Sequence, residues 1–159
     1  MKPETLQEIK NYFKDLTIDY YDVNGTPGVV VKQNDALKIC KSLKEVFDFD
    51  MLCDAVGIDN FQKEYRFEVV YNLYSIKRKD RLFVKVVLLD STNPKMESIT
   101  QVWKSANWYE REVYDMLGIE FLNHPDLRRI YMPDEFEYFP LRKDFPTMGI
   151  AGSLYLPKK

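Results

Sequence analysis

The chain of 159 residues is long enough for one domain with an appendage, and its apolar fraction of 45% suffices for a hydrophobic core. Its 23 basic and 25 acidic residues leave a net charge of −2, which excludes the strongly basic surface of a typical nucleic-acid-binding protein. The two cysteines, Cys40 and Cys53, are too few for an iron–sulfur cluster, and a disulfide is not expected in a reducing compartment. Without a long apolar run or a secretory signal, we expect a protein of the cytoplasm or an equivalent compartment.

The first part of the chain predicts a helix followed by a hairpin. Apolar residues recur at helical spacing over residues 4–16, which indicates a short amphipathic helix. The β-branched and aromatic run Thr17–Val23 predicts a strand, and Val29–Lys32 predicts a second one. The residues between them, 24–28, hold two glycines and a proline, so we expect a turn that joins the strands into a hairpin.

The middle of the chain predicts a second helix and then three strands. Asn34 or Asp35 is a suitable N-cap for a helix that runs to about Phe47, with Cys40 on its apolar side. The following apolar runs alternate in the manner of strands, and a basic turn at 77–81 separates the last two. The predicted strands are Met51–Ile58, Arg66–Ile76 and Leu82–Asp90.

After Pro94 the apolar spacing becomes helical again. Ile99, Val102, Trp103 and Ala106 fit one face of a short helix. Asn107 stands three residues before Glu110, which is the spacing of a capping box at the start of a further helix. This last helix is expected to end at Gly118, because glycine is the usual residue after a helix C-terminus. We favour two short helices with a break near Asn107, and a single bent helix is the alternative.

The carboxy-terminal stretch has a different character. Five of the eight prolines lie in residues 124–159, mixed with aromatic and charged side chains. Proline removes backbone donors, so we expect an extended segment, and its aromatic content argues against disorder. The order of elements predicts an α+β fold, a two-layer sandwich with a mostly antiparallel mixed sheet and helices on one side. Residues 1–123 would form this domain, and residues 124–159 would form an extended tail that wraps partner subunits.

The densest charged cluster lies on the helix that ends at Gly118. Glu110 and Glu112 point to opposite sides of a helix, whereas Glu112 shares a face with Asp115, and Arg111 is spaced to pair with Asp115. A metal site would have to enlist Glu112, Asp115 and His124, but this set lacks the spacing of known metal motifs. We therefore favour a structural network of ion pairs and caps. That network comprises Glu110, Arg111, Glu112, Asp115, Gly118 and His124. We predict no catalytic, cofactor-binding or metal-binding residue in this chain.

The tail allows two interpretations. Its arginines can form salt bridges with a partner's carboxylates while its aromatic side chains anchor the contact. Alternatively, the basic residues form a solvated patch with pairs to Asp126, Asp134 or Asp144 of the same chain. Because prolines and aromatics alternate with the charges, we favour a partner interface in which the tail becomes ordered only against other subunits. The predicted interface residues are Arg128, Arg129, Phe136, Tyr138, Phe139, Arg142, Lys143 and Phe145.

One stretch of the sequence resembles a known family. The motifs Glu-Arg-Glu-x-Tyr-Asp-Met-Leu-Gly (110–118), His-Pro-x-Leu-x-Arg-Ile (124–130) and Pro-Leu-Arg-Lys-Asp (140–144) are similar to those of the 30 kDa subunit of respiratory complex I, also called the C subunit or, in plastids and cyanobacteria, the J subunit. The resemblance is dense from 103 to 146. It implies a subunit without a prosthetic group in the peripheral arm of a proton-pumping quinone reductase, on the cytoplasmic or stromal face of the membrane.

The resemblance also implies partners and cofactors outside this chain. The expected partners are the forty-nine-kilodalton-type subunit and the iron–sulfur subunits of the twenty-kilodalton and twenty-three-kilodalton types. The clusters and a flavin or other electron-input cofactor would be carried by other subunits. Within the same family, a membrane-bound hydrogenase or formate hydrogenlyase is an alternative holoenzyme. An alternative of another class is a small metal-dependent enzyme that uses Glu112, Asp115 and His124.

Overall fold

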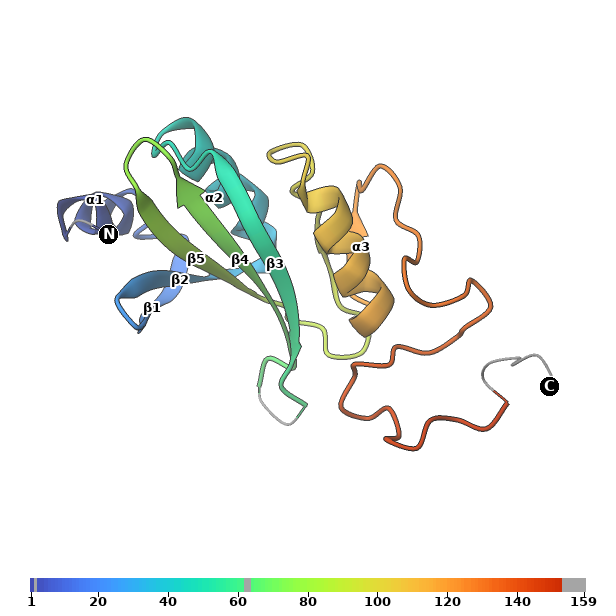
Figure 1. The fold of residues 1–159 in the computed structure, drawn as a ribbon. Helices are drawn as coiled ribbons and strands as arrows, with labels where there is room; N and C mark the ends of the chain where they lie inside the picture. The colour runs from blue at the N-terminus through green and yellow to red at the C-terminus, as the bar shows by residue number, and fades with distance from the viewer. Residues whose placement is uncertain (2, 62–63, 153–159) are drawn as a thin grey trace.

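A computed structural model describes residues 1, 3–61 and 64–152 (Figure 1). It confirms the predicted α+β class and a sandwich in which a mixed sheet is backed by helices (Figure 1). In chain order the elements are α1 (Pro3–Tyr12), β1 (Thr17–Val23), β2 (Thr26–Lys32), α2 (Gln33–Glu45), β3 (Met51–Asp59), β4 (Phe67–Ser75), β5 (Asp80–Val87), β6 (Lys95–Glu97), α3 (Ala106–Leu117) and β7 (Glu120–Leu122).

The main sheet has five strands in the order β1-β2-β5-β4-β3. All neighbours are antiparallel except β2 and β5, which run parallel. The predicted hairpin β1–β2 and the hairpin β4–β5 are both present. A short parallel pair, β6 with β7, was not predicted, and α3 forms the crossover between its two strands.

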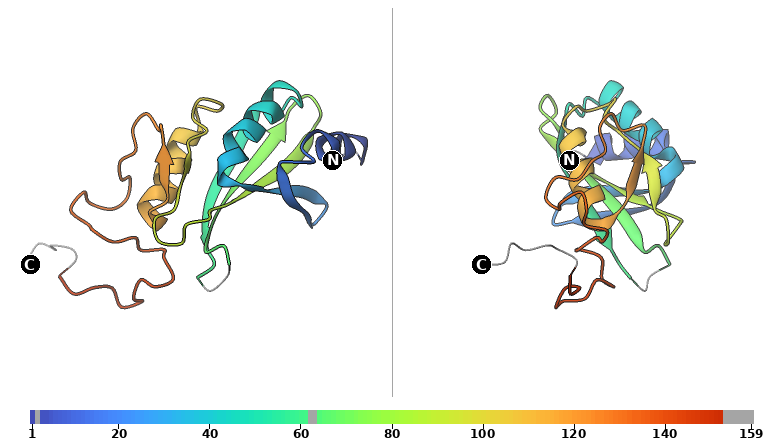
Figure 2. Two further views of the ribbon diagram at one scale, coloured as in Figure 1. Left: turned by 180° about the vertical axis from the view of Figure 1, so that it is seen from behind. Right: turned by 90° about the vertical axis from the view of Figure 1, so that its right-hand side faces the viewer.

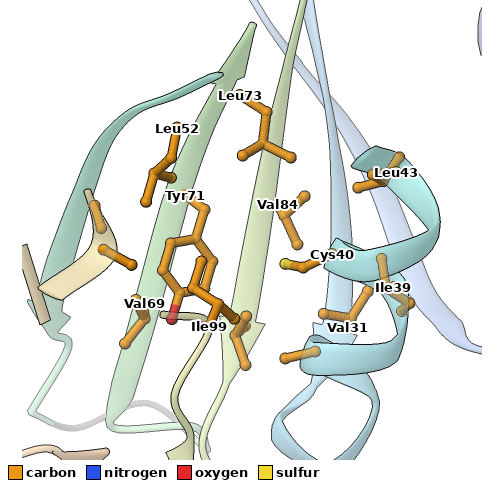
Figure 3. Packing of buried hydrophobic residues seen from close by; sticks show 14 of the residues in the cluster. Val31, Ile39, Cys40, Leu43, Leu52, Val69, Tyr71, Leu73, Val84 and Ile99 are labelled. Atoms are coloured by element: carbon orange, nitrogen blue, oxygen red, sulfur yellow. The ribbon is translucent and has the colours of Figure 1, made fainter. Parts of the chain in front are cut away.

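One face of the sheet carries the core. Alternate residues of β4 are buried along its whole length, and the partners of these residues on β5 and β2 are buried as well. Figure 3 shows Ile39, Cys40 and Leu43 of α2 directed toward Val84 and the neighbouring strands. Ile9 of helix α1 and Phe13, which directly follows the helix, join this core and have almost no exposed surface.

The helix boundaries differ from the sequence predictions at two places. Helix α1 ends at Tyr12 and is followed by turns, so the prediction of a helix to residue 16 was too long. Helix α2 begins at Gln33, and its N-cap is Lys32, which has extended backbone and makes no side-chain cap bond. Asn34 and Asp35 therefore lie inside the first turn. Gln33 instead accepts a hydrogen bond from the backbone N–H of Leu89, which ties the helix start to the end of the sheet.

The predicted helix over Ile99–Ala106 is wrong. Val102 and Trp103 both donate backbone hydrogen bonds to the carbonyl of Ile99, which makes a tight turn instead of a continuing helix. The apolar spacing has a different cause, since Ile99, Val102, Trp103 and Ala106 are all buried in the core as the chain folds back from β6. Helical spacing over so few residues cannot distinguish a helix from successive turns.

The tail follows β7, runs past the outer side of α3 and lies away from α1 (Figures 1 and 2). Its described part, residues 124–152, contains turns and no helix or strand, as its prolines led us to expect. In the part of the chain that the structure describes, no helix combines the length and apolar character needed to cross a bilayer.

Candidate functional site

Asp115 on α3 holds the beginning of the tail. Its side chain is completely buried. Carboxylate oxygen Oδ2 accepts backbone N–H bonds from Ile130 at 3.0 Å, Tyr131 at 2.6 Å and Met132 at 3.0 Å. Oxygen Oδ1 accepts a bond from Arg129 Nη1 at 2.7 Å. All of these donors are in the tail, so a single carboxylate fixes the direction in which the tail leaves the domain.

The hydrogen bonds explain the electrostatics of Asp115. Burial raises the pKa of this carboxyl, but the N–H groups of residues 130–132 and the Arg129 guanidinium outweigh burial and hold its pKa below the usual value. The predicted pair between Arg111 and Asp115 is therefore wrong, since Asp115 pairs with Arg129. Arg111 instead donates to the backbone carbonyls of Arg128 and Arg129 and lies over the Trp108 ring.

His124 fixes the turn between β7 and the tail. Its Nδ1 accepts the backbone N–H of Asp126 at 3.0 Å, and its Nε2 lies 3.2 Å from the carbonyl oxygen of Asn107. These partners require the proton to be on Nε2 in the neutral ring. Burial lowers the pKa of His124, and nearby Arg111 also favours the neutral form. The ring thus joins the start of α3 to the tail.

Glu110 is buried on the core side of α3. Its Oε1 accepts the backbone N–H of Ile99 at 2.8 Å, and its Oε2 accepts the Ser98 hydroxyl at 2.6 Å. The capping-box prediction was wrong, because α3 begins at Ala106 with Ser105 as an N-cap that makes no side-chain bond. Glu110 holds the turn after β6 instead. Burial raises the pKa of Glu110 to about 7 despite these two hydrogen bonds.

The residues of the metal hypothesis do not form one site. Asp115 is buried and bonded to the tail, Glu112 is exposed, and His124 turns both ring nitrogens to backbone groups. Glu112 and Asp115 share a face of α3 by their spacing, but Asp115 is buried beneath the tail and Glu112 is exposed to solvent. Among the described residues, no group of three His, Cys, Asp or Glu side chains is placed to hold a metal ion.

Gly118 ends α3 as predicted. Its φ of 70° is in the left-handed region, and its N–H bonds to the carbonyl of Tyr114. A Cβ at this position would lie 2.5 Å from Phe139 and 2.6 Å from Arg142. Arg142 meanwhile donates from Nε to the carbonyl of Leu117 at 2.6 Å, so it caps the helix from the tail.

Replacing Gly118 by alanine is expected to destabilise the folded chain by about 2 kcal/mol. The substitution adds left-handed strain of about 1 kcal/mol and forces Phe139 and Arg142 away from the helix end. Urea unfolding monitored by tryptophan fluorescence measures the change. Gly149→Ala is the matched control, since Gly149 also has positive φ but has open space around its Cβ position. Equal losses for both variants would show that crowding at Gly118 contributes nothing.

A second anchor, which the sequence patterns did not predict, holds the far part of the tail. Asp59 at the end of β3 is buried and accepts two bonds from Arg66 and one from the backbone N–H of Lys143. Arg66 also pairs with Asp144 at 2.8 Å. Burial raises the pKa of Asp59, but Arg66 and the backbone donors outweigh it and keep the pKa low. No local pattern indicates this cluster, because its members come from distant parts of the sequence.

Several residues of the predicted partner interface contact the chain's own domain. Arg129, Arg142 and Lys143 are bonded to the chain's own domain, and Phe136 is only 3% exposed because its own chain covers it. Phe136 packs edge-on against Tyr138 and Phe145, while Phe139 packs against Tyr114. Arg128 pairs with Asp126, which is one of the intrachain pairs that we considered. In α3 and the described part of the tail, the exposed large apolar side chains include Trp108, Tyr131, Tyr138, Leu141 and Met148.

Comparison with known proteins assigns this arrangement to a family. The model of the family described as "Respiratory-chain NADH dehydrogenase, 30 Kd subunit" matches residues 29–150. The chain belongs to this family. The C subunit of the NADH-quinone oxidoreductase of Geobacter sulfurreducens is 43% identical over 143 residues, which cover 89% of this chain and 88% of the relative. The corresponding subunit of Geotalea uraniireducens is 41% identical over 142 residues, which cover 89% of this chain and 86% of that protein. A C subunit from Rhizobium meliloti is 45% identical over 133 residues, which cover 82% of this chain and 72% of that protein.

The match to the 30 kDa subunit family includes both tail anchors. Residues 29–150 contain Asp59 and Asp144 as well as Glu110 and Asp115, so the match extends over the domain core and the anchored part of the tail. A chain in the structure of the membrane-bound sulfane sulfur reductase, an archaeal respiratory membrane complex, superposes with a TM-score of 0.77. That likeness covers 91% of this chain and 85% of the other at 22% identity, and it shows that the two share a fold.

Proposed function

We propose that this chain is a peripheral-arm subunit of a proton-pumping, complex I-type quinone oxidoreductase, where it scaffolds the quinone-reducing module without a reaction of its own. The observation that carries the proposal is the family match over residues 29–150, together with relatives at 41–45% identity that are named as the C subunit of NADH-quinone oxidoreductase. The relatives are matched over most of their length, so the likeness concerns the whole subunit.

The geometry supports a scaffolding role. The buried carboxylates of Asp59, Glu110 and Asp115 accept hydrogen bonds from backbone N–H groups and side chains of the same chain. Their arrangement fixes the tail against α3 and β3. Trp108, Tyr131 and other apolar side chains remain exposed, and aromatic residues are the typical anchors of protein interfaces.

The family resemblance and the exposed tyrosines of the tail support the following finer assignments. The partners would be the forty-nine-kilodalton-type subunit and the two smaller iron–sulfur subunits, of the twenty-kilodalton and twenty-three-kilodalton types, with Tyr131 and Tyr138 of the tail contributing to the contact. The chain itself would bind no cofactor, and the clusters and the flavin or other electron-input cofactor would be held by other subunits. The complex would keep this chain on the cytoplasmic or stromal face of the energy-transducing membrane.

A tagged copy expressed in the native host tests the proposal. Purification from membranes in mild detergent is expected to recover a large complex with iron–sulfur clusters and quinone reductase activity. Mass spectrometry identifies the subunits, and assays with NADH or reduced ferredoxin identify the donor. An untagged strain controls for carry-over.

Three outcomes would contradict the proposal in different ways. Recovery of the chain alone would exclude a stable subunit role. Recovery with a nickel-containing, hydrogen-evolving complex would replace the quinone reductase by the hydrogenase alternative. A stoichiometric metal in the isolated chain would reopen the possibility of a metal-dependent enzyme.

A further inference from the structure

A groove of about 230 Å³ lies between β3 and α3. Four consecutive residues of β3, Asp54–Gly57, line one side. Successive side chains of a strand point to opposite faces, so a groove that touches four in a row must follow the edge of the strand. The other side is formed by Glu112, Val113, Met116 and Leu117 of α3, and Leu141 of the tail closes the groove.

Strand β3 is an edge strand of the sheet. A register shift between Leu52 and Asp54 interrupts its pairing with β4, and the carbonyls of Leu52 and Cys53 accept bonds from Ser105 and Tyr109. The first turns of α3 thus occupy the beginning of this edge. Within the part of the chain that the structure describes, no such bond reaches the outer edge from residues 54 to 58. An edge of this kind is a template for an additional strand.

Helix α3 packs closely against β3 at Gly57, next to the groove. A Cβ on Gly57 would lie 2.5 Å from Leu117 and 2.8 Å from Val113, so glycine allows the helix to pack directly on the strand. The helix therefore lies against the core face of β3 while the groove remains open beside it. Val56 is 48% exposed and Leu141 is 60% exposed, which gives the groove two apolar contact points at the surface.

The charge of the groove is negative. Asp54 and Glu112 both line it. Among the described residues, neither carboxylate has a lysine, arginine or histidine nitrogen within 4.0 Å, unlike Asp59 and Asp115 nearby. Two carboxylates without cationic partners beside exposed apolar side chains favour an occupant with basic and apolar residues.

We propose that this groove is a docking site for an extended segment of another subunit, which adds to the edge of β3 with a lysine or arginine toward Asp54 and Glu112 and an apolar side chain between Val56 and Leu141. The inference rests on the proposed function, because it requires the chain to be part of a complex. Backbone pairing supplies the general affinity of such a contact, and the side chains supply its specificity.

Photo-crosslinking in the purified complex tests the site. A benzoylphenylalanine at Val56 is expected to capture one segment of another subunit that contains a lysine or arginine and lacks proline at its centre. The matched control is the same probe at Val23, which is 46% exposed on β1 at the opposite edge of the sheet. Capture of the same segment from Val23, of a second copy of this chain, of residues of the same chain, or of no protein at all would overturn the proposal.

Charge reversal tests the electrostatic part. The double variant Asp54→Lys/Glu112→Lys is expected to reduce the amount of chain recovered in the complex about tenfold, because like charges would then face each other. The control is Asp15→Lys/Asp50→Lys, which reverses two exposed carboxylates outside the groove. Circular dichroism of both variants checks that the fold is retained. Reversing the captured lysine or arginine to glutamate should restore assembly.

The groove proposal and the proposed function fail in distinguishable ways. If the wild-type chain is recovered in a complex but Val56 captures no other subunit, the groove proposal is wrong and the proposed function stands. If the wild-type chain is recovered alone, the proposed function fails and the groove proposal fails with it. Normal assembly of the folded double variant would likewise overturn the groove proposal.

Discussion

Replacing Asp115 by alanine is expected to destabilise the folded chain by about 3–5 kcal/mol, the loss typical of removing one partner of a buried ion pair. The substitution leaves Arg129 without its carboxylate and three backbone N–H groups, at residues 130–132, without their acceptor. The tail should then detach near residue 129. Urea unfolding measures the stability, and limited proteolysis with mass spectrometry locates new cleavage in residues 126–145.

The matched control is Asp134→Ala, since Asp134 is an exposed carboxylate of the same tail. It should change stability by less than about 0.5 kcal/mol, as surface substitutions usually do. If Asp115→Ala resisted proteolysis as well as the wild-type chain, the Asp59 cluster alone would hold the tail. The combined variant with Asp59→Ala would then be required to release it.

The low pKa of Asp115 gives this anchor a defined dependence on pH. A carboxyl whose folded-state pKa is below its unfolded value of about 3.9 stabilises the fold above that value. The contribution is lost as the pH falls through the folded-state pKa, when the carboxylate takes up a proton. We therefore expect the tail to be released in acid, and we expect Asp115→Ala to weaken that response.

The sequence predicts well those elements whose signal is local. Strand β4 alternates buried and half-buried residues over its entire length, and Gly118 ends α3 where the pattern placed it. The two three-residue strands β6 and β7 could not be predicted, because each is defined only by its parallel partner across α3. A strand this short has no periodicity of its own.

For the polar network, the sequence predicted the members but not their bonding partners. The sequence identified Glu110, Arg111, Asp115 and His124 as one structural cluster, but it assigned their partners from helical spacing. The actual partners of Asp115 lie in the tail, and Glu110 bonds to Ser98 and Ile99. Spacing along a helix predicts only those neighbours that lie on the same helix, whereas these two carboxylates bond to segments outside α3.

The cluster at Asp59 could not be predicted from the sequence. Its members, Asp59, Arg66, Lys143 and Asp144, are brought together only after the tail has folded back to the end of β3. Arg142 and Lys143 were predicted at a partner contact because prolines and aromatics flank them. An extended segment of this composition can lie on its own domain or on another, and the sequence does not distinguish the two.

Glu110 is expected to make the fold less stable as the pH rises. Its folded-state pKa of about 7 exceeds the ordinary value of 4.5 because burial disfavours the charged form. The folded chain therefore keeps a proton on Glu110 that the unfolded chain releases. The contribution of this group to stability is complete below the ordinary pKa and is lost as the pH rises through 7, a change of about 3 kcal/mol.

Among the described residues, the one basic side chain paired with Glu110 is His124, which is neutral near pH 7. His124 Nε2 is 3.9 Å from Oε2, but burial lowers the pKa of His124, and its Nε2 proton is directed to Asn107. Cys40 and Tyr71 are buried nearby, and burial raises the pKa of both, so they stay neutral. Ser98 can donate to the carboxylate or accept from the protonated acid, since its hydroxyl also meets that of Thr100 at 2.7 Å.

Glu110→Gln tests this origin of the pH dependence, because glutamine has the shape of the protonated acid and no charge. At pH 8 the variant should be more stable than the wild-type chain, by as much as about 3 kcal/mol if its hydrogen bonds are kept, and at pH 5 the difference should fall below about 1 kcal/mol. Urea unfolding between pH 5 and pH 8 provides the comparison. Glu112→Gln, an exposed neighbour on the same helix, should follow the wild-type curve. An equally steep pH dependence in Glu110→Gln would show that another group is responsible, and a large loss of stability at pH 8 would mean that Ser98 and Ile99 require the charged carboxylate.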